Sequence, residues 1–268
     1  MKSLPVLFVA HGAPTVALNP GPLGAALAAT ARELATPRAI LVVSPHWDTA
    51  EPALGAALQP QTIHDFSGFP RELYSLRYPS PGAPAVAVEA KNLLEDAGFK
   101  AAIDVQRGLD HGAWVPLRLM FPEATIPVVP LSIQSRRDPA HHYRLGQALQ
   151  PLAQQGVLIV ASGNLTHNLM HFRFAPPGAD MPPAYVAAFT EWIWQRLAAH
   201  EIGALQQYRR DAPGAVDAHP TDDHLLPLFV ALGAAGERFD PRRIFSGVYD
   251  RAIAMDSFAL QPSSPPLH

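Results

Sequence analysis

The apolar runs of this chain limit its fold more than any other feature of the sequence. They are rich in Val, Ile and Leu, do not alternate with polar residues, and cover residues 4–10, 39–44, 126–133 and 157–161. This pattern is typical of strands that are buried on both faces, as in a largely parallel sheet. Helical patterns lie between or after these runs, at residues 22–34, 83–97, 139–155 and 183–199. Because strands and helices alternate, the sequence predicts an α/β fold.

The remainder of the chain is consistent with one domain. Two more strands are predicted at residues 243–248 and 252–260, joined tightly around residues 249–251 as an antiparallel pair at the edge of the sheet. The tail, residues 261–268, is rich in proline and is predicted to be irregular. No segment has the composition of a linker. We therefore expect residues 1–268 to form a single domain with a largely parallel central sheet flanked by helices.

The composition excludes several kinds of site and partner. The chain has no cysteine, which rules out disulfides, thiolate metal sites and cysteine nucleophiles, but it has 12 histidines. A bound metal would therefore have imidazole, carboxylate or water ligands. The net charge is -3 and no basic tract is present, so nucleic acid is not an expected partner. No apolar stretch reaches the ~18 to 20 residues of a membrane helix, and the first apolar run lacks a signal-peptide cleavage site; we expect a cytoplasmic protein.

Histidines follow three of the predicted strands. His11 ends the first apolar run, His46 lies just beyond the second, and His167 follows the run at residues 157–161 by a few positions. In open α/β sheets, ligands bind outside the carboxyl ends of the strands, where loops from several strands converge. The sequence therefore predicts that these three histidines meet at one edge of the sheet.

Two further histidines lie at predicted helix starts. In HPTDDHLLPL, Thr221 or Asp222 is a predicted helix N-cap, which places His224 in the first turn. There the helix dipole disfavours imidazolium, and a neutral imidazole is what a metal requires. In DHGAWVPL, a loop turns into a helical segment just after His111. The His111 side chain could face a bound substrate or support a metal ligand.

Each histidine also has a simpler interpretation. A lone histidine after a strand is more often a hydrogen-bonded structural residue than a ligand. The convergence of His11, His46 and His224 is what favours metal ligation. His167 and His171 are four residues apart, but this spacing alone is a weak metal signal. We expect solvated side chains at His141, His142, His200 and His268, and core positions for Trp47 and Trp114.

Six ordered motifs give the sequence a resemblance to a known family. They are HGAP, SPHW, HDFSGFP followed by YPSPG, DHGAWVPL, SGNLTHNL and HPTDDHLLPL. In this order they closely resemble the LigB-type class III extradiol ring-cleaving dioxygenases, and within that group the 4,5-DOPA dioxygenase branch. The resemblance extends from about His11 to about Phe258. It implies a single α/β domain with one metal ion at the strand ends, which opens a catechol ring next to one hydroxyl with O2.

The resemblance implies a role for each of five histidines. His11 and His46 match the first two metal-binding histidines, and His224 matches the third ligand. His167 matches the acid/base histidine, which some zinc-loaded members place close enough to be a fourth ligand. His111 matches a histidine that lines the substrate pocket.

These roles imply a reaction and its cofactor. Three ligands on one face of a metal leave positions open for the catechol oxygens and O2, as in non-haem Fe(II) oxygenases. His167 would remove a hydroxyl proton and later return one, and His111 would donate a hydrogen bond to a bound oxygen. The expected cofactor is one divalent metal ion per chain, Fe(II) for the O2 chemistry, with Zn(II) as a second candidate because imidazole suits both. The expected substrate is a small catechol such as L-DOPA, cleaved at the 4,5 bond.

Other positions of the motifs concern the substrate pocket. Asp65, Phe66 and Tyr74 are predicted to contact the substrate beyond the ring. Two positions depart from the family pattern: Asp223 stands where Glu is expected, and Ser257 stands where an aromatic residue is common. These departures concern the surroundings of the third ligand and one wall of the pocket.

Two other functions fit the same residues. The first is a zinc hydrolase, in which a metal-bound water is the nucleophile and His167 or Asp223 the base. The second is a metal-binding protein without catalytic activity. A dioxygenase consumes O2 only with a catechol and iron, a hydrolase works without O2, and a binding protein does neither.

Overall fold

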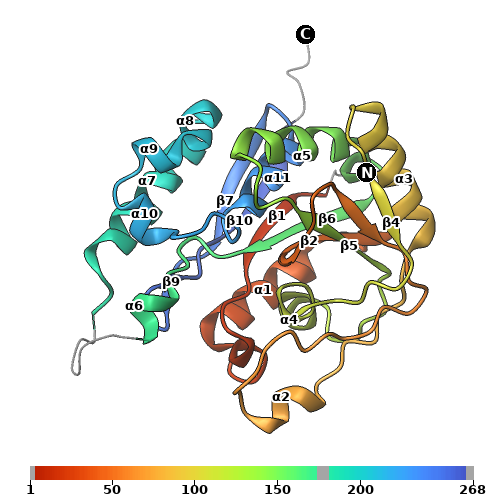
Figure 1. Cartoon of the computed structure of the whole chain (residues 1–268), viewed down its shortest axis with the longest axis horizontal. Coiled ribbons are helices and arrows are strands. Elements are labelled where there is room, and N and C mark those ends of the chain that lie inside the picture. Colours follow the sequence, from red (N-terminus) through yellow and green to blue (C-terminus); the bar gives the residue numbers. More distant parts are fainter. Residues whose placement is uncertain (1–3, 174–180, 264–268) are drawn as a thin grey trace.

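An eight-stranded sheet forms the centre of the computed structural model, which describes residues 4–173 and 181–263 (Figure 1). The strand order is β4-β3-β5-β2-β6-β1-β10-β7. The four central strands are parallel: β1 (Val6–Ala10), β2 (Ala39–Asp48), β5 (Val128–Ile133) and β6 (Val157–Gly163). Every residue of β1, β5 and β6 is buried, which explains their unbroken apolar sequences. The predicted buried parallel sheet is confirmed.

The margins of the sheet differ from the prediction. The antiparallel pair near the end of the chain exists as β7 (Phe239–Phe245) and β10 (Ser257–Pro262), but β10 lies between β1 and β7, so only β7 is an edge strand. The turn at residues 249–251 joins a separate small sheet, β8 (Val248–Tyr249) and β9 (Ile253–Ala254). The first two residues of the predicted irregular tail belong to β10, and residues 264–268 lie outside the described chain. The opposite margin consists of β3 (Ala53–Gly55) and β4 (Ala102–Asp104), which at three residues each are too short to give a clear pattern.

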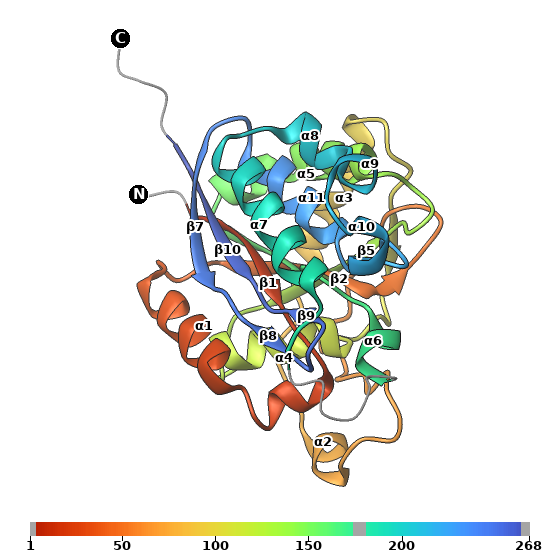
Figure 2. The ribbon, with the colours of Figure 1, turned by 90° about the vertical axis from the view of Figure 1, so that its left-hand side faces the viewer.

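Helices cover both faces of the sheet, because successive strand residues point to opposite sides. In β1, Val6 and Phe8 join one core cluster, and Leu7 and Val9 join the other. Figure 2 shows the two helical layers. The first cluster packs against α3 (Pro84–Asp96), α5 (Pro139–Gln154), α7 (Ala184–Ala198) and the wholly buried α11 (Leu226–Ala235). The second packs against η1 (Pro14–Ala17), α1 (Gly21–Glu33) and α4 (His111–Met120).

Short helices complete the described chain. They are α2 (Arg71–Ser75), α6 (Leu169–Arg173), α8 (Ile202–Gln206), α9 (Tyr208–Asp211) and α10 (Ala215–Ala218). The four helices predicted from periodicity occur within one or two residues of their expected bounds. Within the described ranges, no helix has both the length and the hydropathy required to cross a membrane.

The solvated positions predicted for two histidines of α5 are wrong. His141 and His142 are both buried, because the start of α5 packs against the end of β5. His142 Nδ1 lies 3.0 Å from the carbonyl of Asp138, and its Nε2 accepts from the backbone N–H of Gln134 at 3.3 Å. His200 is exposed as predicted, and His268 lies outside the described residues. The predicted core positions of the two tryptophans are confirmed, since Trp47 and Trp114 are buried.

Candidate metal and catalytic site

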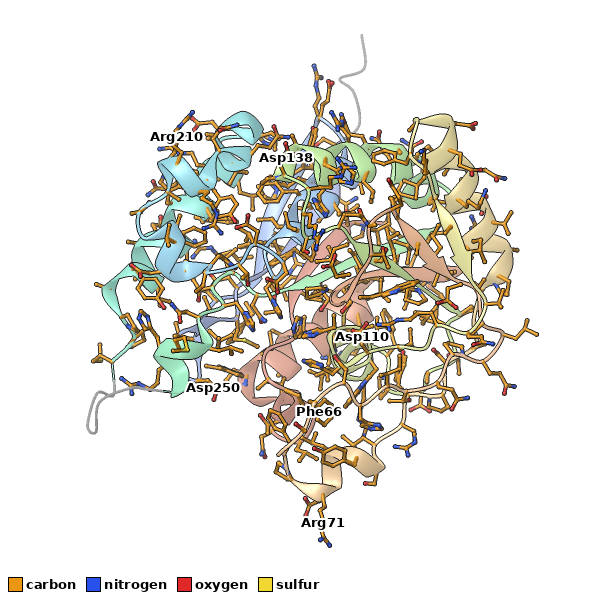
Figure 3. All side chains as sticks on the ribbon, in the orientation of Figure 1. Phe66, Arg71, Asp110, Asp138, Arg210 and Asp250 are labelled. Carbon is orange, nitrogen blue, oxygen red and sulfur yellow. The ribbon has the colours of Figure 1, made fainter. Side chains whose placement is uncertain are left out.

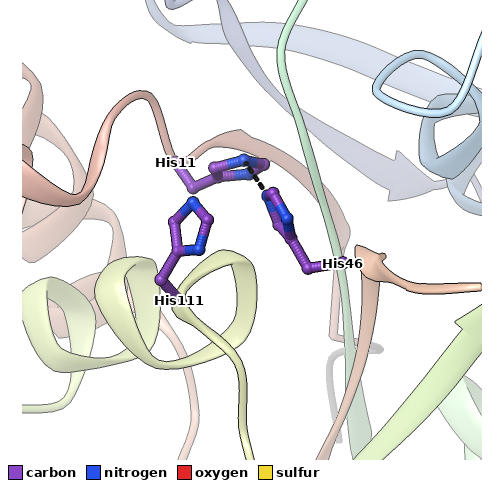
Figure 4. Close-up of side chains that lie close together, drawn as sticks. All are labelled: His11, His46 and His111. Atoms are coloured by element: carbon purple, nitrogen blue, oxygen red, sulfur yellow. Dashed lines mark hydrogen bonds between the residues drawn. The ribbon is translucent and has the colours of Figure 1, made fainter. Parts of the chain in front are cut away.

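Five histidine rings meet at the carboxyl edge of the parallel strands. The ring centroids of His11 and His46 are 5.1 Å apart, and that of His224 lies 5.3 Å and 5.0 Å from them. His111 lies 3.9 Å from His46, and His167 lies 3.5 Å from His224. Figure 4 shows three of these rings turned toward one another from the end of β1, from β2 and from the start of α4. The convergence predicted from the strand ends is present.

His11 presents an unprotonated nitrogen to the site. The Ser162 hydroxyl donates to the carbonyl of Gly112 at 2.5 Å, so it accepts from His11 Nδ1 at 2.9 Å. His11 Nε2 is then left without a proton, and it lies 3.2 Å from His46 Nε2. Burial, followed by the neighbouring histidines, lowers the pKa of His11 well below its ordinary value, so the ring is neutral. A neutral imidazole with its lone pair facing the cluster is the form that binds a metal.

Asp65 holds two of the histidines. One carboxylate oxygen lies 2.8 Å from His111 Nδ1 and 3.4 Å from His46 Nδ1, and the other accepts from the backbone N–H of His111 at 2.9 Å. Burial raises the pKa of this carboxyl, but the hydrogen bonds from His111 and the nearby histidine charges outweigh it, and the pKa falls to about 2. The ionised carboxylate bonded to Nδ1 fixes the His111 ring with Nε2 toward the site, and its charge lies beside Nδ1 of His46. The pKa of His46 falls to about 4 through burial and the proximity of His111.

The backbone under these two histidines is fixed by a buried carboxylate. Asp110 caps α4 by accepting from the N–H of Ala113, and it also bonds Arg107 at 2.6 Å and the Ser44 hydroxyl at 2.5 Å. It therefore ties the start of α4, which carries His111, to β2 two residues before His46. A Cβ on Gly112 would lie 2.4 Å from Ser44 Oγ and 2.8 Å from His46 Cδ2, so glycine allows this approach. Sequence reasoning missed Asp110, although its place before an apolar helical run is an N-cap signal.

The structure corrects the local setting of His224. Thr221 and Asp222 are not N-caps: α11 begins at Leu226 with Leu225 as its cap, so His224 precedes the helix. The reason is that the Asp222 carboxylate already accepts from Tyr208 and Arg209. The ring is neutral nevertheless, because burial, aided by His167 and the other histidines, lowers the pKa of His224 well below its ordinary value.

His224 also provides a test of whether the site fits a metal. Its Nδ1 bonds the carboxylate of Asp223, which fixes Nε2 as the free nitrogen. This Nε2 is buried and has no hydrogen-bond partner. An unpaired buried nitrogen costs free energy unless something else satisfies it. A metal ion would satisfy it, and the imidazole donors around it suit one.

His167 lies against the third predicted ligand. Its ring stacks on that of His224 at an interplanar angle of 9°. Burial lowers the pKa of His167 to about 4, opposed by the charge of Asp223. His171 does not join the cluster: α6 begins only at Leu169, and the exposed His171 ring lies 3.1 Å from the Tyr185 hydroxyl.

The distances between possible ligand atoms group the five histidines differently from the predicted ligand set of His11, His46 and His224. Two groups have their candidate ligand atoms within 4.8 Å of one another: His11, His46 and His111, and His167, Asp223 and His224. By donor atoms, His111 groups with the first two predicted ligands and His224 does not, although the ring centroid of His224 lies slightly nearer to His11 than that of His111 does. In the second group the carboxylate is bonded to Nδ1 and the two rings are stacked, so their in-plane lone pairs aim at separate points. The second group is better described as support for His224 than as an independent metal site.

An aromatic cluster borders one side of the histidines. Phe66, labelled in Figure 3, belongs to this cluster. Its ring meets that of His111 edge-on at 5.7 Å, and the Tyr74 ring lies 5.3 Å from it. Phe66 therefore reaches the site, whereas Tyr74 is one ring removed, with its hydroxyl near the N–H of Phe69. The Ser257 hydroxyl accepts from the N–H of Ala10 at 3.0 Å, so this buried residue supports the end of β1 and does not open a pocket wall.

Comparisons with known proteins agree with this arrangement. The family model described as the catalytic LigB subunit of aromatic ring-opening dioxygenase matches residues 23–249. A 4,5-DOPA dioxygenase extradiol of Beta vulgaris is 44% identical over 86% of each chain. Proteins of the same name from Mirabilis jalapa and Escherichia coli K12 are 42% and 37% identical, over 75% and 86% of this chain and 74% and 85% of their own.

A solved structure extends the likeness to the fold. It is the crystal structure of an uncharacterized protein of Escherichia coli K12, with a TM-score of 0.78 and 29% identity, and it covers 96% of this chain and 99% of its own. The family model alone spans most of the chain. The relatives also match most of it, at an identity well above that of unrelated sequences. This chain belongs to the LigB family of aromatic ring-opening enzymes, which are metal-dependent extradiol dioxygenases.

Proposed function

We propose that this chain, acting as one catalytic domain over residues 1–268, uses one Fe(II) ion and O2 to open the ring of a small catechol such as L-DOPA at the 4,5 bond. The observation that carries the proposal is the meeting of His11, His46 and His224 at the strand ends as neutral imidazoles. Nε2 of His11 lies 3.2 Å from Nε2 of His46, and the buried Nε2 of His224 has no hydrogen-bond partner. The substrate is suggested by the relatives named 4,5-DOPA dioxygenase extradiol.

His11, His46 and His224 would hold the metal. Ser162 and Asp223 bond Nδ1 of His11 and His224, and the Asp65 carboxylate lies 3.4 Å from Nδ1 of His46. Bound Fe(II) supplies the O2 chemistry and lowers the pKa of a coordinated hydroxyl, whereas Zn(II) fits the same ligands but has no redox chemistry. His111 is the fourth inward-facing ring, and we assign it to the substrate because it borders Phe66 and the aromatic cluster.

His167 is the proposed acid/base group. Its pKa of about 4 keeps the ring neutral near neutral pH, so it can accept the proton of a catechol hydroxyl and later return one. The nearby Asp223 charge favours the protonated ring once the transfer has occurred. The stacking of His167 on His224 supports this role, because it would put the base beside a proposed metal ligand.

His111 would orient the substrate by a hydrogen bond. Since Asp65 accepts the Nδ1 proton, Nε2 of neutral His111 can only accept. To donate from Nε2, as the sequence suggested, the ring must carry a proton on each nitrogen. Phe66 would face the catechol ring, and contacts of Asp65 and Tyr74 with the substrate remain predictions.

The test is O2 uptake by apoprotein reconstituted anaerobically with Fe(II) or with Zn(II). L-DOPA is compared with catechols that carry a carboxylate or an uncharged side chain. We expect uptake with iron only, and a loss of at least about 100-fold in His46→Ala, which removes a ligand; His200→Ala, at an exposed histidine, is the control. Absence of uptake with every catechol, from protein shown to hold iron, would refute the proposal for these substrates and favour a zinc hydrolase.

A further inference from the structure

A hydrogen-bond network behind the site joins α9 to the loop that carries His224. The carboxylate of Asp222 accepts from the Tyr208 hydroxyl and from the Arg209 guanidinium. Its backbone carbonyl accepts from the N–H groups of Leu225 and Leu226, at 2.9 Å and 3.1 Å. Asp222 is thus held at its side chain by α9 and at its backbone by the turn around His224.

The same guanidinium also reaches the other end of this loop. Arg209 donates to the carbonyl of His219 at 2.8 Å. The buried His219 ring donates from Nε2 to the carbonyl of Leu165 at 2.9 Å, and burial lowers its pKa to about 3. Leu165 lies two residues before His167, whose N–H donates to the carbonyl of Ala218 at 2.8 Å.

Arg209 therefore bonds both ends of the segment between His219 and Asp222. At one end this segment bonds the backbone just before His167, and at the other it bonds the backbone just after His224. We infer that Arg209, through Asp222 and His219, is a positioning residue that sets where His224 and His167 stand relative to His11 and His46. None of these network residues is a proposed metal ligand, so the effect is indirect. The inference rests on the proposed role of His224 as a metal ligand.

The network is open to solvent on its outer side. The Arg209 side chain is 38% exposed, and with Tyr208, Arg210 and Asp222 it lines a surface cavity of about 390 Å³. A small guanidinium compound can therefore reach the place that the Arg209 head group leaves when the side chain is shortened. The next residue provides a matched control, because the Arg210 side chain is 71% exposed and pairs with its neighbour Asp211.

The experiment measures Co(II) affinity and the visible Co(II) spectrum of full-length apoprotein, for wild type, Arg209→Ala and Arg210→Ala, each with and without methylguanidinium. We expect Arg209→Ala to bind Co(II) about tenfold or more weakly with an altered spectrum, as for groups that orient metal ligands. Arg210→Ala is expected to match the wild type. Methylguanidinium is expected to restore affinity in Arg209→Ala alone.

Two results would overturn the inference: wild-type affinity and spectrum in Arg209→Ala, or an equal loss in Arg210→Ala. If Arg209→Ala does not fold, Arg209→Lys replaces it, since lysine keeps the charge but lacks the planar guanidinium that bonds both Asp222 and the carbonyl of His219. An unchanged Co(II) spectrum there also overturns the inference. Co(II) binding needs no catechol, so the two proposals can fail separately. A wild type that binds Co(II) but consumes no O2 with any catechol when loaded with Fe(II) would refute the proposed substrate reaction and leave the Co(II) comparison valid. A wild type that binds no Co(II) would refute the proposed metal site itself.

Discussion

For His11 and His111, the group that Nδ1 meets determines which ring nitrogen carries the proton. Ser162 accepts from His11 at 2.9 Å, and Asp65 accepts from His111 at 2.8 Å. Such partners leave an unprotonated nitrogen facing inward, as metal ligands and proton acceptors require. The sequence predicts the histidines, because each follows a strand or opens a helix. It does not predict these partners, which lie 151 and 46 residues away along the chain.

The charge of Asp65 has a measurable effect on metal binding. Asp65→Asn keeps the shape of the side chain but removes the charge that orients His46 and His111. We expect Co(II) to bind about 10- to 100-fold more weakly, measured by titration of the apoprotein. Asp96→Asn, at an exposed position at the end of α3, is the control and should bind as the wild type does. Equal affinities in Asp65→Asn and the wild type would mean that Asp65 does not hold the ligands.

A buried histidine outside the cluster of five makes stability depend on pH. Burial lowers the pKa of His142 from 6.5 to about 4, although its bond to Asp138 opposes the shift. The folded protein therefore binds fewer protons here than the unfolded chain, so this contribution is complete above about pH 6.5 and is lost as the pH falls toward 4. His142→Gln should flatten the fall in unfolding free energy by up to about 1.4 kcal/mol per pH unit in this window.

The measurement is urea unfolding of the apoprotein at several values between about pH 7 and pH 5. His200→Gln, at an exposed position, should leave the slope of the wild type unchanged. Parallel slopes for His142→Gln and the wild type would show that His142 does not titrate with folding.

Secondary-structure elements were predictable where their own sequence specifies them. The long apolar runs gave β1, β2, β5 and β6, and the 3.6-residue periodicity gave α1, α3, α5 and α7. The cap of α11 was not predictable from its local sequence, because Asp222 bonds side chains of α9 in place of the α11 amides. Likewise β3 and β4 depend on their neighbours in the sheet, since β3 pairs with the longer β5 and β4 pairs with β3.

The close approach of α4 to β2 depends on one glycine. In Gly112→Ala the added methyl group would press on Ser44 and His46, so that the two elements must separate. We expect a loss of about 1–3 kcal/mol in unfolding free energy and weaker Co(II) binding. Gly203→Ala in α8 is the control, because its Cβ meets nothing within 4 Å and alanine favours a helix. A Gly112→Ala protein as stable and as metal-competent as the wild type would contradict the described packing.

Across the molecule, the parallel sheet explains why distant segments form one site. Strand polarity brings His11, His46 and His167 to a single edge, and this part was predictable because it follows from the alternation of strands and helices. The grouping of His111 with His11 and His46 was not, since it depends on where Asp65 and Asp110 fix the start of α4. The fold thus followed from local patterns, whereas the finer geometry of the site depends on contacts between segments far apart in the chain.

The most direct test of the central claim is the stoichiometry and product of one reaction. The iron-loaded protein is supplied with limiting L-DOPA, and O2 consumption, hydrogen peroxide and product mass are measured together. Extradiol cleavage predicts one O2 consumed per L-DOPA, a ring-opened product heavier than L-DOPA by the mass of O2, and no hydrogen peroxide. Consumption of O2 with release of hydrogen peroxide and formation of a quinone would contradict the claim, because the protein would then be oxidising the catechol without opening its ring.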